Sequence, residues 1–502
     1  AALWPLAFVA LIPLLIAMDR AETAAPVLDG LVWGAGFFSV LLYWLYTFFR
    51  HYGQLGPIAS VATLALLVGY LALYPGLFAH LGSLLLQRHG SAGWLLLPPL
   101  WVGLEWVRGR ALTGFPWGLA GYSLAPCLPL IQVSALSGVY GVSFLVVSAN
   151  VLGAASVRYS KGRPLRLKVL GVTVGFLFFS SFVFGLRAMS RQADTPVHRV
   201  ALVQANVRQD LKWSPGAARE ILMKHEQLTS EAAQRGARLV LWPESSSPFP
   251  LSYPGSGGSG SRPNRPYREA IQELSRRFGI SLLFGTVDYR DSPGGARPVN
   301  AAALVRDDGS WGERYDKMHL VPFGEYVPLG RILTFVNRVA QGAIGDFVPG
   351  EVPRVVRAEG VSIGTTICYE AIFPELVRLF PLNGAQILAN LTNDAWFGTS
   401  AGPYQHFDMA IFRAVENRRT LLRAANTGIS AIVDPVGRVR TRSRLGETRV
   451  LEGGVEPANR LTLYTRYGDV FAILCAILAA AALAAGLTRV KRGEKEEAGG
   501  GQ

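Results

Sequence analysis

Seven apolar runs that fit bilayer-crossing helices constrain this chain more than any other feature. The runs lie near residues 2–17, 30–49, 57–86, 93–107, 129–155, 169–187 and 469–488. A helix needs about 20 mostly apolar residues to cross a bilayer. The composition agrees with a large membrane part, because only 17% of the residues are charged, whereas soluble domains carry about 25%. We therefore predict a polytopic α-helical membrane domain.

Basic residues give these helices a direction. The net charge is +14, the densest basic stretch (158–168) joins two apolar runs, and another (489–492) follows the last run. Cytoplasmic loops carry such an excess of lysine and arginine. Placing both stretches in the cytoplasm leaves the segment from about 190 to 468 outside. The same placement argues against nucleic acid as a partner.

These boundaries predict four parts of the chain. Residues 1–190 would hold six transmembrane helices, 191–465 an extracytoplasmic domain, 466–490 a final transmembrane helix, and 491–502 a cytoplasmic tail. The same counting places the first residue outside, so we also expect one earlier transmembrane helix to be missing from this chain. The first run lacks a basic start and a small-residue cleavage site, so it is not expected to be a removable signal peptide.

The extramembrane segment alternates short apolar stretches with amphipathic ones. The strand candidates are 200–206, 239–242, 281–287, 301–305, 361–367, 386–391 and 429–434. The helix candidates are 217–234, 267–278 and 404–418. Alternation of this kind predicts a layered α/β domain.

The cysteines leave one candidate for chemistry. Cys127, Cys368 and Cys475 are scattered, and neither a CxxC pair nor an HExxH motif is present. A disulfide framework or a metal site is therefore not expected, and no cofactor is expected either. Cys475 lies in an apolar run and Cys127 in a proline-rich loop, where packing explains them. Cys368 follows a strand candidate in the extramembrane segment.

Three chemically complementary side chains each follow a strand-like run. Glu244 comes after 239–242, Lys317 after Tyr315, and Cys368 after 361–367. Acyl transfer through a thioester needs a thiolate, a base that generates it, and positive charge for the oxyanion. Because the ends of separate strands can converge in a layered sheet, we expect these three side chains to form one site. The backbone N–H of Tyr369 would assist Lys317 at the oxyanion.

The surrounding motifs resemble the nitrilase, or carbon–nitrogen hydrolase, superfamily. They are Trp242-Pro243-Glu244-Ser245, the run from Lys317 to Glu325, and Ile367-Cys368-Tyr369-Glu370. The membrane-embedded branch of that superfamily, the apolipoprotein N-acyltransferases, is more similar still. That resemblance includes Leu112-Thr113-Gly114-Phe115-Pro116-Trp117, Leu211-Lys212-Trp213, Asn393-Asp394-Ala395-Trp396-Phe397-Gly398 and Gln405-His406-Phe407. It implies a nitrilase-like α-β-β-α sandwich for the extramembrane domain.

The resemblance also implies roles for single residues. Glu244 would be the general base, Lys317 the oxyanion stabiliser and Cys368 the nucleophile. Further residues would support the site: Glu325, Tyr369 and Glu370 would stabilise the lysine and the intermediate, and Trp213 would bind substrate. We expect Trp396 and His406 to be scaffold residues.

The reaction implied by this branch has two steps. Cys368 would take an acyl chain from the sn-1 position of a phospholipid, such as phosphatidylethanolamine, as a thioester. The α-amino group of an S-diacylglyceryl cysteine at the start of an apolipoprotein would then accept the chain as an amide. The enzyme would be a monomer in the bacterial inner membrane, with its catalytic domain on the periplasmic side.

Two other classes of protein stay open at this point. A membrane-tethered amidase or nitrilase would use the same three side chains with water as the acceptor. A transporter or sensor would carry the extramembrane domain only as a binding module. The intact Glu, Lys and Cys set disfavours the second class, and the number of apolar runs disfavours the first.

Overall fold

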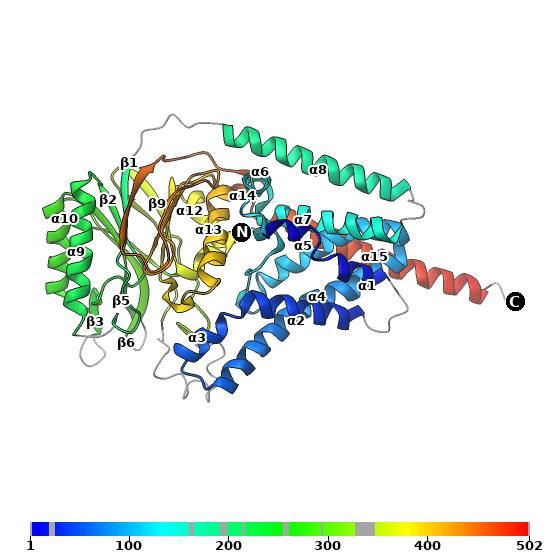
Figure 1. The fold of residues 1–502 in the computed structure, drawn as a ribbon, viewed down its shortest axis with the longest axis horizontal. Coiled ribbons are helices and arrows are strands. Elements are labelled where there is room, and N and C mark those ends of the chain that lie inside the picture. Colours follow the sequence, from blue (N-terminus) through cyan, green and yellow to red (C-terminus); the bar gives the residue numbers. More distant parts are fainter. Residues whose placement is uncertain are drawn as a thin grey trace. The chain divides into compact units, whose positions relative to one another are not determined.

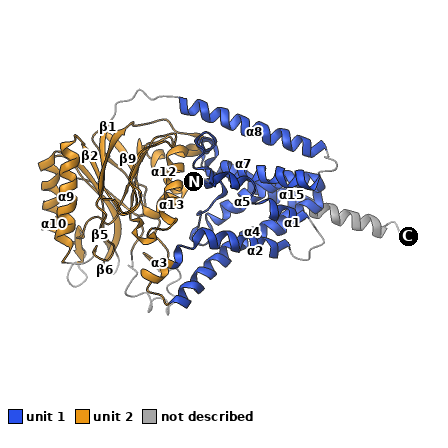
Figure 2. Ribbon diagram, viewed as in Figure 1, with its two compact units in different colours: residues 1–46, 57–191, 467–502 blue, residues 47–56, 192–466 orange. Residues whose placement is uncertain are grey.

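The computed structural model describes residues 3–19, 26–159, 165–190, 198–212, 216–254, 261–292, 295–326 and 347–499. The chain divides into two compact units (Figure 2). The helical unit comprises residues 1–46, 57–191 and 467–502, and the catalytic unit comprises 47–56 and 192–466. The predicted Trp213 lies outside the described residues.

The helical unit is built from apolar helices of unequal length (Figure 1). They are α1 (Ile12–Asp19), α2 (Pro26–Leu42), α3 (Leu45–His51), α4 (Pro57–His89), α5 (Leu97–Arg108), α6 (Leu128–Ile131), α7 (Ser134–Arg158), α8 (Leu165–Ser190) and α15 (Val470–Gly499). Leucine, valine and alanine side chains of α1, α4, α5, α7 and α8 form its buried core. α3 begins in this unit and ends in the catalytic unit.

All seven predicted runs contain helix in the described part of the chain, but fewer meet the length of a bilayer span. Three segments are long and apolar enough: Pro57–Arg108, Ser134–Arg158 and Leu165–Ser190. A fourth arises if α2 and α3, bent by 57°, count as one broken span. The first and last runs form shorter apolar helices, Trp4–Asp19 and Val470–Ala485. The predicted runs 57–86 and 93–107 both lie within Pro57–Arg108. The protein therefore has the helices of a membrane protein, and seven spans stays a prediction.

The catalytic unit has four layers, helix–sheet–sheet–helix (Figure 1). Within the described residues, one six-stranded sheet has the order β14-β1-β2-β5-β6-β7 and the other β13-β12-β11-β10-β9-β8. Helices α9 and α10 cover the first sheet, whereas α12 and α13 cover the second. The strands β1, β2 and β6 contact β11 and β9 across the inner interface. The predicted α-β-β-α sandwich is confirmed.

The elements of the catalytic unit have the following bounds. The first sheet contains β1 (His198–Gln204), β2 (Leu239–Trp242), β5 (Ser281–Ser292), β6 (Gly295–Val305), β7 (Trp311–Asp316) and β14 (Arg449–Val455). The second contains β8 (Val355–Ala358), β9 (Val361–Ile367), β10 (Ile387–Thr392), β11 (Leu421–Ala425), β12 (Ala431–Val433) and β13 (Val439–Arg442). A small hairpin pairs β3 (Ser252–Pro254) with β4 (Ser261–Pro263). The helices are α9 (Ala218–Gln234), α10 (Arg265–Phe278), α12 (Pro374–Leu382), α13 (Gly402–Asn417) and α14 (Leu463–Tyr467).

Parallel pairing at the centre of each sheet places functional residues at one edge. β1, β2 and β5 are parallel, as are β9, β10 and β11. The carboxyl ends of parallel strands meet at the same edge, where ligands bind in open α/β sheets. Glu244 follows β2, whereas Cys368 and Asn393 directly follow β9 and β10. Lys317 directly follows β7, which is antiparallel to β6.

The central strands are buried on both faces, as their apolar sequences require. Every residue of β2 and of β10 is buried. Between the first sheet and its helices, the Phe284 ring lies edge-on to Trp242, with ring centroids 5.9 Å apart, and is fully buried. This interface fixes the end of β2, after which Glu244 stands.

A short segment before α4 belongs to the catalytic unit although it lies far away in sequence. The Tyr52 hydroxyl donates a hydrogen bond to the main-chain oxygen of Ala395 at 3.0 Å. Its ring lies edge-on to Trp396, with centroids 4.8 Å apart, and Phe48 contacts the same indole at 6.2 Å. Within the segment, the Arg50 side chain donates a hydrogen bond to the main-chain oxygen of Leu55 at 2.8 Å.

Truncating Phe284 tests the core of the first sheet. Phe284→Ala would leave a cavity beside Trp242, and such a change costs about 3–5 kcal/mol of unfolding free energy. Met223→Ala on α9 is the control, because the Met223 side chain is 54% exposed. Thermal unfolding in detergent, followed by tryptophan fluorescence, measures both. Equal midpoints for the two variants would contradict the packing described here.

Candidate active site

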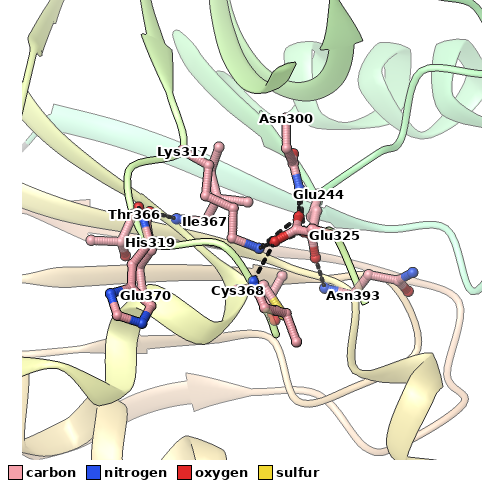
Figure 3. Close-up of polar contacts among 12 residues, drawn as sticks. Glu244, Asn300, Lys317, His319, Glu325, Thr366, Ile367, Cys368, Glu370 and Asn393 are labelled. Atoms are coloured by element: carbon pink, nitrogen blue, oxygen red, sulfur yellow. Dashed lines mark hydrogen bonds and ion pairs between the residues drawn. The ribbon is translucent and has the colours of Figure 1, made fainter. Parts of the chain in front are cut away.

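Three strand ends and one loop bring a thiol, an ammonium group and two carboxylates together (Figure 3). The Lys317 Nζ lies 2.9 Å from Glu325 Oε2 and 3.6 Å from Glu244 Oε1. Cys368 follows β9 in the opposite sheet and is 6% exposed. Three of these residues were predicted from strand ends and the fourth, Glu325, from the resemblance. The structure places all four in one site.

Lys317 is a cation kept charged by its neighbours. Its side chain is 1% exposed, and burial alone would lower the pKa of the ammonium group. The negative charges of Glu325 and Glu244 outweigh burial, so the pKa of Lys317 lies above its usual value. Lys317 therefore stays charged at neutral pH and can stabilise negative charge that develops on sulfur or oxygen.

Asn300 separates the two carboxylates. Its Nδ2 donates to Glu244 Oε1 at 2.9 Å and to Glu325 Oε1 at 2.7 Å. Glu325 Oε2 also accepts the backbone N–H of Val321 at 2.8 Å. One amide group and one ammonium group thus hold two like charges side by side.

Glu244 is fixed on its remaining sides by main-chain contacts. Its Oε2 accepts the backbone N–H of Asn393 at 3.0 Å, and its own main-chain oxygen accepts from Lys212 Nζ at 2.9 Å. A Cβ on Gly285 would lie 2.5 Å from the Glu244 Cα, so only glycine lets β5 approach this turn. The carboxylate is therefore held in one orientation before any substrate binds.

Cys368 occupies a strained turn at the start of a 3₁₀ segment, Cys368–Ile372. Its φ of 50° lies in the left-handed region, which non-glycine residues enter at functional sites more often than elsewhere. Burial raises the pKa of the thiol, the charge of Glu244 adds to this rise, and Lys317 opposes it. The resting thiol is consequently protonated, and its reaction needs a base.

A buried hydrogen-bond network of His406, Arg423 and Asp394 holds the main-chain oxygen of Cys368. His406 Nε2 donates to that oxygen at 3.2 Å, so Nε2 carries the ring proton. Burial and then the nearby Arg423 lower the pKa of His406, so the ring is neutral. Arg423 Nη2 lies 3.1 Å from His406 Nδ1 and donates to Asp394 Oδ2 at 2.8 Å. His406 therefore supports the main chain of Cys368, which agrees with the scaffold role predicted for it.

Glu370 connects the end of β9, which precedes Cys368, to the residues that follow Lys317. Its Oε1 accepts the Tyr315 hydroxyl at 2.7 Å and the backbone N–H groups of Met318 and His319 at 2.7 and 3.0 Å. Its Oε2 accepts the backbone N–H of Ile367 at 2.7 Å. Glu370 therefore holds the residues beside Lys317 against the residue before Cys368. It acts through these two neighbours.

The Tyr369 side chain packs against His319, two residues after Lys317, and against Phe373. Its ring lies edge-on to Phe373, with centroids 5.1 Å apart, and 5.9 Å from the His319 ring. Burial and the charge of Lys317 lower the pKa of His319 to about 4. The imidazole is thus neutral near pH 7 and adds no charge to the site.

Sequence reasoning missed three contributors: Asn300, Asn393 as a donor to Glu244, and Lys212. Asn393 directly follows β10, so the strand-end rule that found Cys368 applies to it. Asn300 lies inside β6, where a single polar residue in an apolar stretch was the only signal. The described residues contain no group of three or more His, Cys, Asp or Glu side chains arranged to hold a metal ion.

Comparison with known proteins places this site in a family. The carbon-nitrogen hydrolase family matches residues 199–459, and the apolipoprotein N-acyltransferase N-terminal domain matches residues 1–152. An apolipoprotein N-acyltransferase from Geobacter metallireducens is 39% identical over 489 residues, covering 96% of this chain and 91% of that protein. The chain belongs to the apolipoprotein N-acyltransferase family.

Other members of the apolipoprotein N-acyltransferase family are similar over nearly the whole chain. The protein from Nitrosomonas europaea is 33% identical, and the match covers 96% of this chain and 93% of that protein. Among solved structures, an amidase mutant from Nesterenkonia sp. AN1 is 23% identical, covers 55% of this chain and 97% of its own, and has a TM-score of 0.39. A nitrilase-superfamily protein from Saccharomyces cerevisiae is 20% identical. Its match covers 53% of this chain and 93% of its own, with a TM-score of 0.40. The resemblance found in the sequence is confirmed, and the chain is an acyltransferase.

Placing a third carboxylate in the acyltransferase site tests the role of Asn300. Asn300→Asp would set a charge beside Glu244 and Glu325 with only Lys317 between them. A buried charge without a partner costs about 3–5 kcal/mol, so we expect a lower unfolding midpoint together with loss of acyl transfer. Asn383→Asp is the control, since Asn383 is exposed. Full activity of Asn300→Asp would contradict the proposed charge arrangement.

The protonated state of Cys368 predicts a pH dependence. In a chain carrying Cys127→Ser and Cys475→Ser, labelling of Cys368 by a lipophilic maleimide should be slow near pH 7. The rate should rise continuously up to about pH 9, because only the thiolate reacts and the pKa of the thiol is raised. Mass spectrometry at timed intervals measures the rate. Fast labelling that does not change with pH would mean a thiolate at rest.

Proposed function

We propose that the protein transfers an acyl chain from the sn-1 position of a phospholipid, through a thioester on Cys368, to the N-terminus of an apolipoprotein. The acceptor is the α-amino group of an S-diacylglyceryl cysteine. The observation that carries this proposal is the buried thiol beside Lys317, which lies between the carboxylates of Glu244 and Glu325. A protonated nucleophile, a base and a permanent cation are what thioester chemistry needs.

The first step forms the thioester. Glu244 takes the proton from Cys368, and the sulfur attacks the ester carbon of the phospholipid. Lys317 stabilises the oxyanion, with the backbone N–H of Tyr369 as a second donor, while Glu325 keeps the lysine in place. When the carbon–oxygen bond breaks, Glu244 returns its proton to the leaving alkoxide, and a lysophospholipid departs. Phosphatidylethanolamine is the proposed donor.

The second step discharges the thioester by the same groups in reverse. The α-amino nitrogen attacks the thioester carbon, and Glu244 accepts a proton from the nitrogen. The carbon–sulfur bond breaks, an amide forms, and the proton passes to the departing thiolate of Cys368. Water would compete for the same carbon, so a site that admits acyl chains in place of water favours transfer over hydrolysis.

The charge pattern of the chain supports a location for this chemistry. With the basic stretches 158–168 and 489–492 in the cytoplasm, residues 191–465 lie on the periplasmic side of the inner membrane. A diacylglyceryl acceptor and a phospholipid donor both reside in that membrane. We propose that the apolar helices hold the monomeric enzyme where both lipids are present.

Intact mass spectrometry tests the first step directly. Incubating the detergent-purified protein with phosphatidylethanolamine should add the mass of one acyl chain, removable by hydroxylamine. Cys368→Ala should show no gain, whereas Cys475→Ser should behave like the unchanged protein. Adding a diacylglyceryl-cysteinyl peptide should then discharge the adduct and yield an acylated peptide.

Two results would overturn the proposal. Absence of an adduct from folded protein would exclude phospholipid as the donor under these conditions and favour an amidase that uses water. An adduct that persists in Cys368→Ala would exclude Cys368 as the nucleophile.

A further inference from the structure

A second buried lysine stands beside the base. The Lys212 side chain is 3% exposed, and its Nζ donates to the main-chain oxygen of Glu244 at 2.9 Å. The charged or titratable groups that act on it or that it acts on come from three different elements: Glu244 after β2, Cys368 after β9, and His225 on α9. The reaction scheme above gives this lysine no role.

Burial makes this position expensive for an ammonium group. Burial lowers the pKa of Lys212 to about 8, although the charges of Glu244 and Cys368 act in the opposite direction. A lysine that served only to fill space would be replaced with gain by an apolar side chain of similar length. The energetic penalty therefore points to a use that needs positive charge.

The positive charge of Lys212 acts on the turn that carries Glu244. Ser245 has a φ of 46°, so the chain bends sharply straight after the base. Gly285 N–H donates to the Pro243 oxygen at 3.1 Å, and Ser246 N–H donates to the Gly285 oxygen at 3.0 Å. These bonds hold the two sides of the bend, and Lys212 holds the carbonyl between them.

We propose that Lys212 is a positioning residue: its ammonium group fixes the main chain of Glu244 and supplies a second positive charge beside this residue. The inference rests on the proposed function, in which Glu244 must accept the thiol proton. Two ammonium groups, Lys212 and Lys317, then balance the two carboxylates Glu244 and Glu325. Without Lys212, one ammonium group would face both carboxylates, and the main chain that carries Glu244 would lose the hydrogen bond that holds it.

The test compares three variants of the full-length protein in detergent. Lys212→Met removes the charge and keeps the length, Lys212→Arg keeps the charge, and Lys224→Met removes a partly exposed lysine of α9. We expect Lys212→Met to form the acyl adduct with phosphatidylethanolamine at least about tenfold more slowly, the size of effect that follows loss of a hydrogen bond to a charged group. Lys212→Arg should recover most of the rate, because its guanidinium group keeps the charge and can donate to the same main-chain oxygen. Lys224→Met should keep the rate of the unchanged protein.

Thermal unfolding separates this role from a structural one. The pKa of Lys212 is about 8 in the folded protein and about 10.4 in an unfolded chain, so the unfolded chain binds more protons between these values. The energetic penalty of the buried charge is thus fully present below about pH 8 and fades as the pH rises towards 10. At pH 7, Lys212→Met should consequently unfold at the same or a higher temperature while it loses activity.

Each remaining outcome decides against the inference. An unchanged acylation rate in Lys212→Met would exclude the role, and so would an equally slow rate in Lys212→Met and Lys212→Arg with a lower unfolding midpoint in both. Failure of Lys212→Met to fold would make Lys212 a structural residue. If the unchanged protein forms no adduct, the proposed function itself fails, and that control is run first.

Discussion

The catalytic unit depends on holding one ammonium group, that of Lys317, charged in a place that water does not reach. An isolated buried charge would cost several kcal/mol, and the carboxylates of Glu325 and Glu244 offset that cost. They in turn need separation from each other, which the Asn300 amide provides. The site is therefore a set of opposite charges that stabilise one another: Lys317 and Glu244 follow strands of the first sheet, and Glu325 stands in a loop. This explains why so many buried polar side chains converge at one edge of the sandwich.

Much of this arrangement follows from the sequence because the strands that carry it are strongly apolar. Before Glu244, β2 is fully buried, and before Cys368, β9 is buried except at Ser362. Apolar runs of this kind can be recognised as strands from the sequence. Parallel pairing aligns the carboxyl ends of neighbouring strands within each sheet, and the packing of the two sheets on each other brings the ends of β2 and β9 to one site. Glu325 was found only through the family resemblance, since it stands in a loop with no strand before it. The order of strands within each sheet could not be read from one sequence, because pairing is decided by contacts far apart along the chain.

Three features that sequence reasoning missed, β11, Asn300 and Lys212, share one cause: a polar residue at a buried position. β11 was not predicted, because Arg423 interrupts its apolar residues. That guanidinium is fully buried and paired with Asp394 and Asn390, so the strand is as much a core strand as its neighbours. Asn300 inside β6 and Lys212 before α9 have the same character. Hydropathy places each of them at the surface, and only the partners contributed by distant segments reverse that assignment.

The contact of Tyr52 and Phe48 with the segment after β10 has a consequence for the order in which the protein is made. Residues 47–56 leave the ribosome long before Ala395 and Trp396, and the segment stands between the apolar helices α2 and α4. The later part of the catalytic unit therefore packs against a segment that is synthesised first. A soluble fragment spanning 192–466 would lack that piece and would leave the Trp396 indole without two of its aromatic neighbours. Residues 47–56 are thus a part of the catalytic unit that the chain supplies before all the rest of that unit.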